Sequence, residues 1–201
     1  MLIEHNGKRP QVHPSAWVAP TAVLSGDVSV GPECRILYGA VLTDDGGPVE
    51  LAEYVIVMEN ALIRGRSGHP TRIGSNVIVG PHAHLNGVEV EQQAFIATGA
   101  GLFPGARVGA RAEVRINGVV HVNTVLPADG MVPIGWVAVG DPAQLFPPGA
   151  HDAIWEIQRT LDFPGTAFGL DRETPELMVA ATGRYAEGFG SHRDDRIVGD
   201  A

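Results

Sequence analysis

The stretch IGSNVIVGPHAHLNGVEV, residues 73–90, places a branched aliphatic residue at Ile73, Val79 and Leu85, a step of six residues. Neither the 3.6-residue period of a helix nor the two-residue alternation of an ordinary strand explains this step. The same step recurs along most of the chain, with a few longer or shorter intervals. The aliphatic positions are Val18, Leu24, Val30, Ile36, Leu42, Leu51, Val57, Ile63, Ile73, Val79, Leu85, Val90, Ile96, Leu102, Val108, Val114, Val120 and Leu126.

Small residues accompany this repeat. An alanine or Cys34 often lies two positions before the aliphatic residue, and a glycine often follows it, as at Gly74 and Gly80. A hexapeptide rung needs this combination, because the aliphatic side chain fills a narrow prism and small residues let the chain turn each corner. Three rungs make one triangular coil of roughly 18 residues. The repeat predicts an all-β fold, a parallel β-helix of hexapeptide repeats with roughly six or seven coils.

A different pattern follows the repeat. Prolines between residues 133 and 148 interrupt the strands, and HDAIWEIQRTL (151–161) carries apolar residues at helical spacing. A second helix is predicted within TPELMVAATGRYAEGF (174–189), and the tail from residue 191 is expected to fray. We therefore divide the chain into a β-helix domain, residues 1–140, and a C-terminal helical extension, residues 141–201, that packs on it.

Composition narrows the function. The chain of 201 residues has a formal charge of -9 and no basic run, which argues against nucleic acid as a partner. No stretch approaches the roughly 20 apolar residues that span a bilayer, and MLIEHNGKRP does not resemble a signal peptide, so no membrane partner and a cytoplasmic location are expected. Cys34 is the only cysteine, so no disulfide forms within one chain, and a buried position is expected for it.

Residues 12–148 resemble the gamma-class carbonic anhydrase family, most clearly in IGSNVIVGPHAHLNG and in GWVAVGDPAQLF (135–146). The resemblance implies a left-handed β-helix and a homotrimer. It also implies a zinc-type metal at each subunit interface, held by three histidines, one of them from the neighbouring chain.

The family's ligand positions carry other residues here. Its first ligand matches Arg64 in MENALIR (58–64), and its Gly-His-(four residues)-His element matches GPHAHLN (80–86), which puts Pro81 and Asn86 at the other two positions. A guanidinium stays protonated and cannot bind zinc. We therefore expect no zinc and little or no carbon dioxide hydration, with a degraded metal site on a lyase-like scaffold.

The candidate site residues are polar groups around these positions. Arg64 and Asn86 belong to an outward column that runs Thr43, Arg64, Asn86, Phe103 and His121 in successive coils, and His82 and His84 lie close to it. Asp45 and Glu59 are further candidates, from the segments that match the family's site. Such groups at a trimer interface suit a small carbonyl or carboxylate compound. No cofactor is expected.

Three alternatives stay open from the sequence. Zinc is the alternative cofactor if His82 and His84 rebuild a relocated site with a third ligand. The chain is otherwise a non-catalytic trimeric scaffold, or a hexapeptide acyltransferase that uses one of these histidines as general base.

Overall fold

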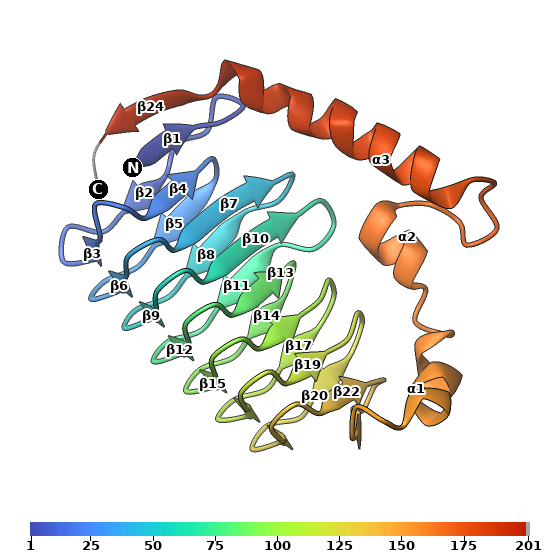
Figure 1. Cartoon of the computed structure of the whole chain (residues 1–201). Coiled ribbons are helices and arrows are strands. Elements are labelled where there is room, and N and C mark those ends of the chain that lie inside the picture. The colour runs from blue at the N-terminus through green and yellow to red at the C-terminus, as the bar shows by residue number, and fades with distance from the viewer. Residues whose placement is uncertain (200–201) are drawn as a thin grey trace.

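The computed structural model describes residues 1–199 as a parallel β-solenoid flanked by a helical arm (Figure 1). Three parallel ladders make the walls of the prism, and consecutive strands of the chain move from one wall to the next. The second and third walls have seven strands each, so the predicted coil number is confirmed.

We call the walls the first, second and third sheet. The first contains β1 (Leu2–Glu4), β4 (Val23–Ser25), β7 (Val41–Asp45), β10 (Leu62–Arg66), β13 (His84–Asn86), β16 (Gly101–Leu102), β19 (Val119–Val120), β22 (Val137–Val139), β23 (Gln144–Phe146) and β24 (Arg196–Gly199). The second contains β2 (Gln11–Val12), β5 (Val28–Val30), β8 (Val49–Leu51), β11 (Thr71–Ile73), β14 (Glu89–Val90), β17 (Arg107–Val108) and β20 (Val125–Leu126). The third contains β3 (Trp17–Val18), β6 (Arg35–Ile36), β9 (Ile56–Val57), β12 (Ile78–Val79), β15 (Phe95–Ile96), β18 (Glu113–Val114) and β21 (Met131–Val132).

The core is the interior of the prism. Every aliphatic position of the hexapeptide repeat is buried, and Leu42, Ile63, Leu85 and Leu102 are among those with no exposed surface. Cys34 is buried as expected, and burial raises the pKa of its thiol. Burial on this scale is what the repeat requires, because a triangular coil has no other apolar interior.

Corners between the walls need a left-handed backbone. His82 has a φ of 57° at the corner between β12 and β13, and Asn123 has a φ of 51° at another corner. Gly105 has a φ of 78°, and a Cβ there would lie 2.1 Å from the Asn123 Oδ1 of the next coil. A glycine is therefore needed where an asparagine side chain crosses the neighbouring corner.

The C-terminal arm, residues 150–199, runs back along the solenoid from the last coil to the first (Figure 1). It contains α1 (His151–Gln158), α2 (Phe163–Phe168), α3 (Leu177–Gly188), the 3-10 helix η1 (Phe189–Asp194) and β24. The helix α2 was not predicted from the sequence. The helix α3 begins at Leu177, later than the predicted 174, because Glu176 has a left-handed φ of 48°.

The expectation of a frayed tail is wrong for residues 196–199. These residues form β24, which pairs antiparallel with β1 at the edge of the first sheet. Arg196 of β24 and Arg9 both donate hydrogen bonds to the buried carboxylate of Glu4. At the other end, β23 pairs antiparallel with β22, so both edges of the first sheet are covered by a strand that ends the parallel ladder.

We predict that Val79→Asp prevents folding. Val79 has no exposed surface and only apolar neighbours, so a carboxylate there costs several kcal/mol, comparable with a domain stability of roughly 5–15 kcal/mol. Arg107→Asp is the control, because Arg107 is exposed and directly precedes the buried Val108 on β17, as Ile78 precedes Val79 on β12. Far-UV circular dichroism and thermal unfolding measure the effect. A folded Val79→Asp protein with an unchanged melting temperature would contradict the interior assignment.

Candidate functional site

The predicted polar column is a row on the outer face of the first sheet. Arg64 pairs in register with Thr43 on β7 and with Asn86 on β13. Leu85 pairs with Leu102, and Leu102 pairs with Val120, so Phe103 and His121 continue the same row. The order of the column is thus confirmed, since the interior residues that precede its members are stacked coil on coil.

Several polar atoms of this face are buried without a hydrogen-bond partner among the described residues. They are Ser25 Oγ, Arg64 Nε, His84 Nε2, Asn86 Oδ1 and His121 Nδ1. All five residues belong to the first sheet or directly follow its strands. Because buried polar groups are ordinarily hydrogen-bonded, their concentration on one face marks a place suited to a polar ligand.

Arg64 is held at the centre of this group. Its Nη2 lies 4.0 Å from Asp45 Oδ2, a distance too long for a hydrogen bond, and its side chain is 29% exposed. Its Cζ lies 5.7 Å from the centre of the Phe189 ring in the arm. Thr71 donates a hydrogen bond to the Arg64 carbonyl, which fixes the backbone. The guanidinium therefore keeps unused donors while its position is constrained.

Two histidines of this face are kept neutral by their surroundings. Burial lowers the pKa of His84, and the nearby Arg64 charge lowers it further. Burial also lowers the pKa of His121. A neutral imidazole can accept a proton on one nitrogen and donate a hydrogen bond from the other.

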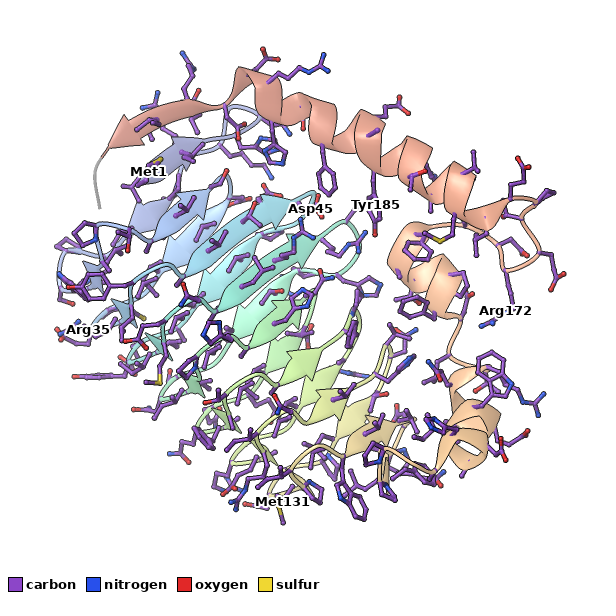
Figure 2. The ribbon with its side chains drawn as sticks, viewed as in Figure 1. Met1, Arg35, Asp45, Met131, Arg172 and Tyr185 are labelled. Atoms are coloured by element: carbon purple, nitrogen blue, oxygen red, sulfur yellow. The ribbon has the colours of Figure 1, made fainter. Side chains whose placement is uncertain are left out.

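The chain's own arm covers part of the column. Gln158 Nε2 lies 2.8 Å from His121 Nε2, and the Phe163 ring centre lies 5.9 Å from that of His121. Aromatic contacts continue along the arm from Phe163 through Phe168 and Tyr185 to Phe189. Figure 2 shows Tyr185 on the side of α3 that faces the solenoid near Asp45. The arm thus shields one side of the site that the sequence placed between subunits.

A pocket of about 340 Å³ opens beside the column, between the loops of the first sheet and the arm. Asp45, Arg66 and His69 line it from the solenoid, and Thr166 and Arg184 line it from the arm. Arg66 also lies with its Cζ 6.0 Å from the Tyr185 ring centre. The pocket adjoins the column through Asp45, whose Oδ2 lies 4.0 Å from Arg64 Nη2.

The other predicted residues are more dispersed. His84 lies on β13, two positions before Asn86 and on the same outward face. His82 is exposed on its corner, and its backbone N–H donates to the Glu59 carbonyl, while the Glu59 side chain is half-buried. In residues 1–199 the three-residue groups of His, Cys, Asp and Glu that could hold an ion do not include His82 or His84.

The residues at the family's ligand positions do not fit a zinc ion. Arg64 is a permanent cation, Pro81 has no side-chain donor, and Asn86 offers one neutral oxygen. A catalytic zinc needs about three nitrogen or oxygen ligands. We derive no metal-dependent step at this place.

Sequence reasoning missed the arm's contribution to the site. Gln158, Tyr185 and Phe189 contact the column or its neighbours, but helical periodicity does not reveal which surface a helix covers. It also left His5 and His192 unassigned, although their rings stack 4.3 Å apart.

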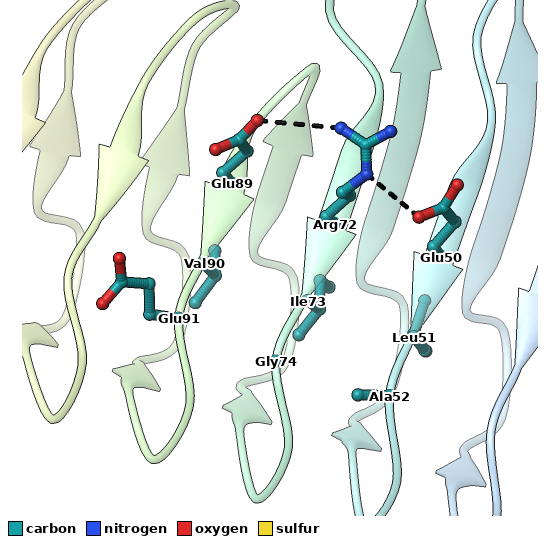
Figure 3. Close-up of a pocket in the computed structure, with 9 residues that line it drawn as sticks. All are labelled: Glu50, Leu51, Ala52, Arg72, Ile73, Gly74, Glu89, Val90 and Glu91. Atoms are coloured by element: carbon teal, nitrogen blue, oxygen red, sulfur yellow. Dashed lines mark hydrogen bonds and ion pairs between the residues drawn. The ribbon is translucent and has the colours of Figure 1, made fainter.

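A second hollow, of about 440 Å³, lies on the second sheet away from the column (Figure 3). Arg72 Nε lies 3.0 Å from Glu50 Oε2, and Arg72 Nη1 lies 3.8 Å from Glu89 Oε1. All three side chains are about half exposed, and exposed pairs of this kind contribute little energy. Their charges are already paired, so this hollow is a weaker candidate than the column.

The fold defines the chain as a hexapeptide-repeat β-solenoid protein, and solved structures agree. A putative acetyltransferase from Bacillus cereus superposes with a TM-score of 0.63 over 91% of this chain and 96% of that one, at 20% identity. A UDP-N-acetylglucosamine acyltransferase from Bacteroides fragilis has a TM-score of 0.58 at 13% identity, covering 87% and 89% of the two chains. At these identities the likeness concerns the fold alone.

Sequence relatives identify the family. The chain is 37% identical over 143 residues to gamma carbonic anhydrase 1, mitochondrial, from Arabidopsis thaliana, which covers 68% of this chain and 50% of the relative. It is 28% identical over 109 residues to a carbonic anhydrase from Geobacillus kaustophilus, covering 54% and 60% of the two chains. Over its solenoid the chain belongs to the gamma carbonic anhydrase family.

The chain spans about half the length of the Arabidopsis relatives it matches. No family model matches the chain. None of the helices in residues 1–199 has the length and apolar character needed to cross a bilayer.

We predict that stability falls as the pH drops below about 6.5, the ordinary pKa of histidine. The pKa values of His84 and His121 are lowered in the fold, so below that pH the unfolded chain binds protons that the folded chain does not. Each histidine contributes a slope of at most about 1.4 kcal/mol per pH unit, down to its pKa in the fold. Urea unfolding between pH 5 and 8 measures the slope.

His84→Gln is expected to make this dependence shallower, because one of the two shifted groups is gone. His13→Gln, at an exposed position, is the control and should leave the slope as in the unmodified protein. An identical slope in His84→Gln and the unmodified protein would contradict the buried neutral state of His84.

Proposed function

We propose that this chain is a carbonic-anhydrase-like protein that binds, and acts on, a small carboxylate or carbonyl compound at the outer face of the first sheet without a metal. The observation that carries the proposal is the set of buried, unpartnered side-chain atoms of Arg64, His84 and Asn86. Arg64 and Asn86 stand at two of the positions where the family's ligands are expected.

The donor pattern favours a small oxyanion. Arg64 Nε donates a hydrogen bond and carries the charge that a carboxylate neutralises, whereas Asn86 Oδ1 accepts a hydrogen bond. A ligand that has both a negative oxygen and a hydroxyl group satisfies both residues at once. Bicarbonate and small hydroxycarboxylates have this combination.

His84 is the residue we propose for proton transfer. Its Nε2 is buried and unpartnered, and its lowered pKa keeps it neutral at physiological pH, so it can accept a proton from a bound hydroxyl group. Arg64 stabilises negative charge that develops on the ligand. Asp45 lies at the margin of the site, with its Oδ2 4.0 Å from Arg64 Nη2, and we propose no chemical step for Asp45 or Glu59.

The alternatives have less support. A relocated zinc site at His82 and His84 needs a third ligand that residues 1–199 of one chain do not bring to them. Acyl transfer rests on fold likeness alone. A non-catalytic scaffold does not account for the buried, unpartnered atoms of Arg64 and Asn86. The binding experiment below distinguishes a scaffold from the proposed function.

We also propose that the chain forms a homotrimer. The outer face of the third sheet exposes a row of apolar side chains, with Trp17 43%, Ile78 41%, Phe95 39% and Met131 46% exposed. Ile78 and Phe95 pair in register on the neighbouring strands β12 and β15 and form the centre of an apolar stripe, and Arg35 on β6 and Glu113 on β18 separate this centre from Trp17 and Met131. Cyclic association covers the same stripe on every chain.

Sedimentation equilibrium is expected to give three times the mass of the 21.2 kDa chain at micromolar concentration. Phe95→Glu is expected to shift the equilibrium toward the monomer, because it puts a charge in the stripe. Arg107→Glu, at an exposed position on the second sheet, is the control. A monomer in the unmodified protein would contradict the trimer.

Calorimetric titration with bicarbonate and with acetate tests the binding proposal. We expect saturable binding, weakened about tenfold or more in Arg64→Gln, since the charge-assisted pair contributes roughly 1.5–3 kcal/mol. Arg72→Gln is the matched control, because Arg72 is an arginine on the second sheet outside the site. Absence of binding to either anion, or equal binding by Arg64→Gln, would favour the scaffold.

Carbon dioxide hydration gives a second test. The unmodified protein is expected to show little or no hydration activity, and the combined change Arg64→His, Pro81→His and Asn86→His is expected to bind zinc at the restored positions. Hydration activity that is lost in His82→Ala and His84→Ala of the otherwise unmodified protein would instead support the relocated site.

A further inference from the structure

The junction between the first and last segments of the chain holds a cluster of three side chains that the proposed function does not use. His5 Nδ1 lies 2.6 Å from Asp195 Oδ1, and His192 Nδ1 lies 2.9 Å from Asp195 Oδ2. The two imidazole rings stack with centres 4.3 Å apart and an angle of 23°. His5 is buried, at 4% exposure, while the other two are half-buried.

The three potential ligand atoms are close enough for one ion. They all lie within 4.8 Å of one another. In a tetrahedral zinc site with bonds of about 2.0–2.2 Å, ligand atoms are roughly 3.3–3.6 Å apart. To reach these spacings, the two Nδ1–carboxylate distances of 2.6 and 2.9 Å must lengthen and the wider separation must shorten, each by a movement on the order of 1 Å.

We propose that His5, His192 and Asp195 form a binding site for one divalent transition-metal ion of the zinc type. Two imidazole nitrogens and one carboxylate oxygen are ligands that zinc prefers, and a water molecule completes the fourth position. Loss of the imidazole protons from the two Nδ1 atoms accompanies binding, because only an unprotonated nitrogen coordinates a metal. The site is independent of the proposed anion site.

Asn6 is placed to support the metal-binding tautomer of His5 once its amide rotates. Its Nδ2 lies 2.9 Å from His5 Nε2, so the amide holds the outer edge of the ring. When Nδ1 binds a metal, the ring carries its proton on Nε2, and a rotated amide accepts that proton's hydrogen bond through Oδ1. Metal-bound histidines ordinarily have such a partner on their second nitrogen.

This site differs in place from the family's ligand positions. His5 directly follows β1, whereas Arg64 lies on β10, three strands away in the first sheet. Three strand spacings amount to roughly 14 Å. An ion at the cluster would therefore join the arm to the first coil and leave Arg64, Pro81 and Asn86 unligated.

A bound ion would link the end of the arm to the first coil and so hold the arm in position over the column. Asp195 and His192 immediately precede β24, which pairs with β1, and Phe189 of the same segment lies over Arg64. The ion adds a link between segments separated by 190 positions in sequence. Zinc is therefore expected to slow proteolysis of residues 150–199.

The test uses the full chain, purified without nickel resin, stripped with a chelator and dialysed. Calorimetry and elemental analysis with added Zn²⁺ are expected to show about one ion per chain, bound at micromolar or lower concentration. His192→Ala is expected to weaken binding at least about tenfold, since even second-shell changes weaken metal sites 10- to 100-fold. Asp195→Asn is expected to act in the same direction.

His82→Ala and His151→Ala are controls at exposed positions and should bind zinc as the unmodified protein does. Circular dichroism confirms that His192→Ala is folded before its affinity is compared. Limited trypsin digestion should show that zinc slows cleavage of the arm in the unmodified protein and has no such effect in His192→Ala.

Three results would each overturn the proposal. One is no zinc binding at concentrations of tens of micromolar, and another is equal affinity in His192→Ala and the unmodified protein. The third is zinc binding that is lost in His84→Ala but kept in His192→Ala, which would place the ion at the column. Anion binding by Arg64 is measured in the stripped protein, so either proposal can fail without the other.

Discussion

The width of the prism is the constraint on which the structure depends. Each coil must place an aliphatic side chain inward at three positions, and these side chains stack on those of the coils above and below. Stacking fixes the register of neighbouring coils, because a one-residue slip would turn every interior side chain outward. Leu42, Ile63 and Leu85 therefore bring Thr43, Arg64 and Asn86 into one row, although more than 20 residues separate consecutive members.

The same constraint explains which parts of the structure could be predicted from the sequence. The hexapeptide period is a local signal that repeats, so it predicted the coils, the interior and the order of the polar column. The resemblance to the family, through the motifs GPHAHLN and MENALIR, placed the ligand positions at Arg64, Pro81 and Asn86, and the loss of the metal site stays a prediction. Arg64 and Asn86 were thus assigned to neighbouring strands, and the pairing of β10 with β13 agrees.

The position of the arm could not be predicted in this way. The apolar positions of α1 and α3 show that each helix covers something, but the surface covered is a property of the folded chain. The contact of Gln158 with His121 and that of Phe189 with Arg64 arise from the path of the arm. The cluster of His5, His192 and Asp195 has no signature in spacing, since it joins the two ends of the chain.

Shielding by the arm changes the energetics of the polar column. A buried polar group without a partner costs roughly 1–3 kcal/mol, and the outer face of the first sheet, part of which the arm covers, has five such atoms. A fold selected for stability alone would place apolar groups there. The column is thus a place where stability is reduced and where a suitable ligand would restore it by satisfying the same atoms.

The return of the chain to its starting point has a consequence for evolution. Solenoids commonly grow or shrink by whole repeats, because each coil contacts only its neighbours. Here β24 must reach β1 after the arm has run the length of seven coils, roughly 30–35 Å at the usual strand spacing. An inserted or deleted coil would leave the arm too short or too long to pair. The length of the arm therefore restricts the number of repeats. Duplication of a coil is tolerated only with a matching change in the length of the arm's helices.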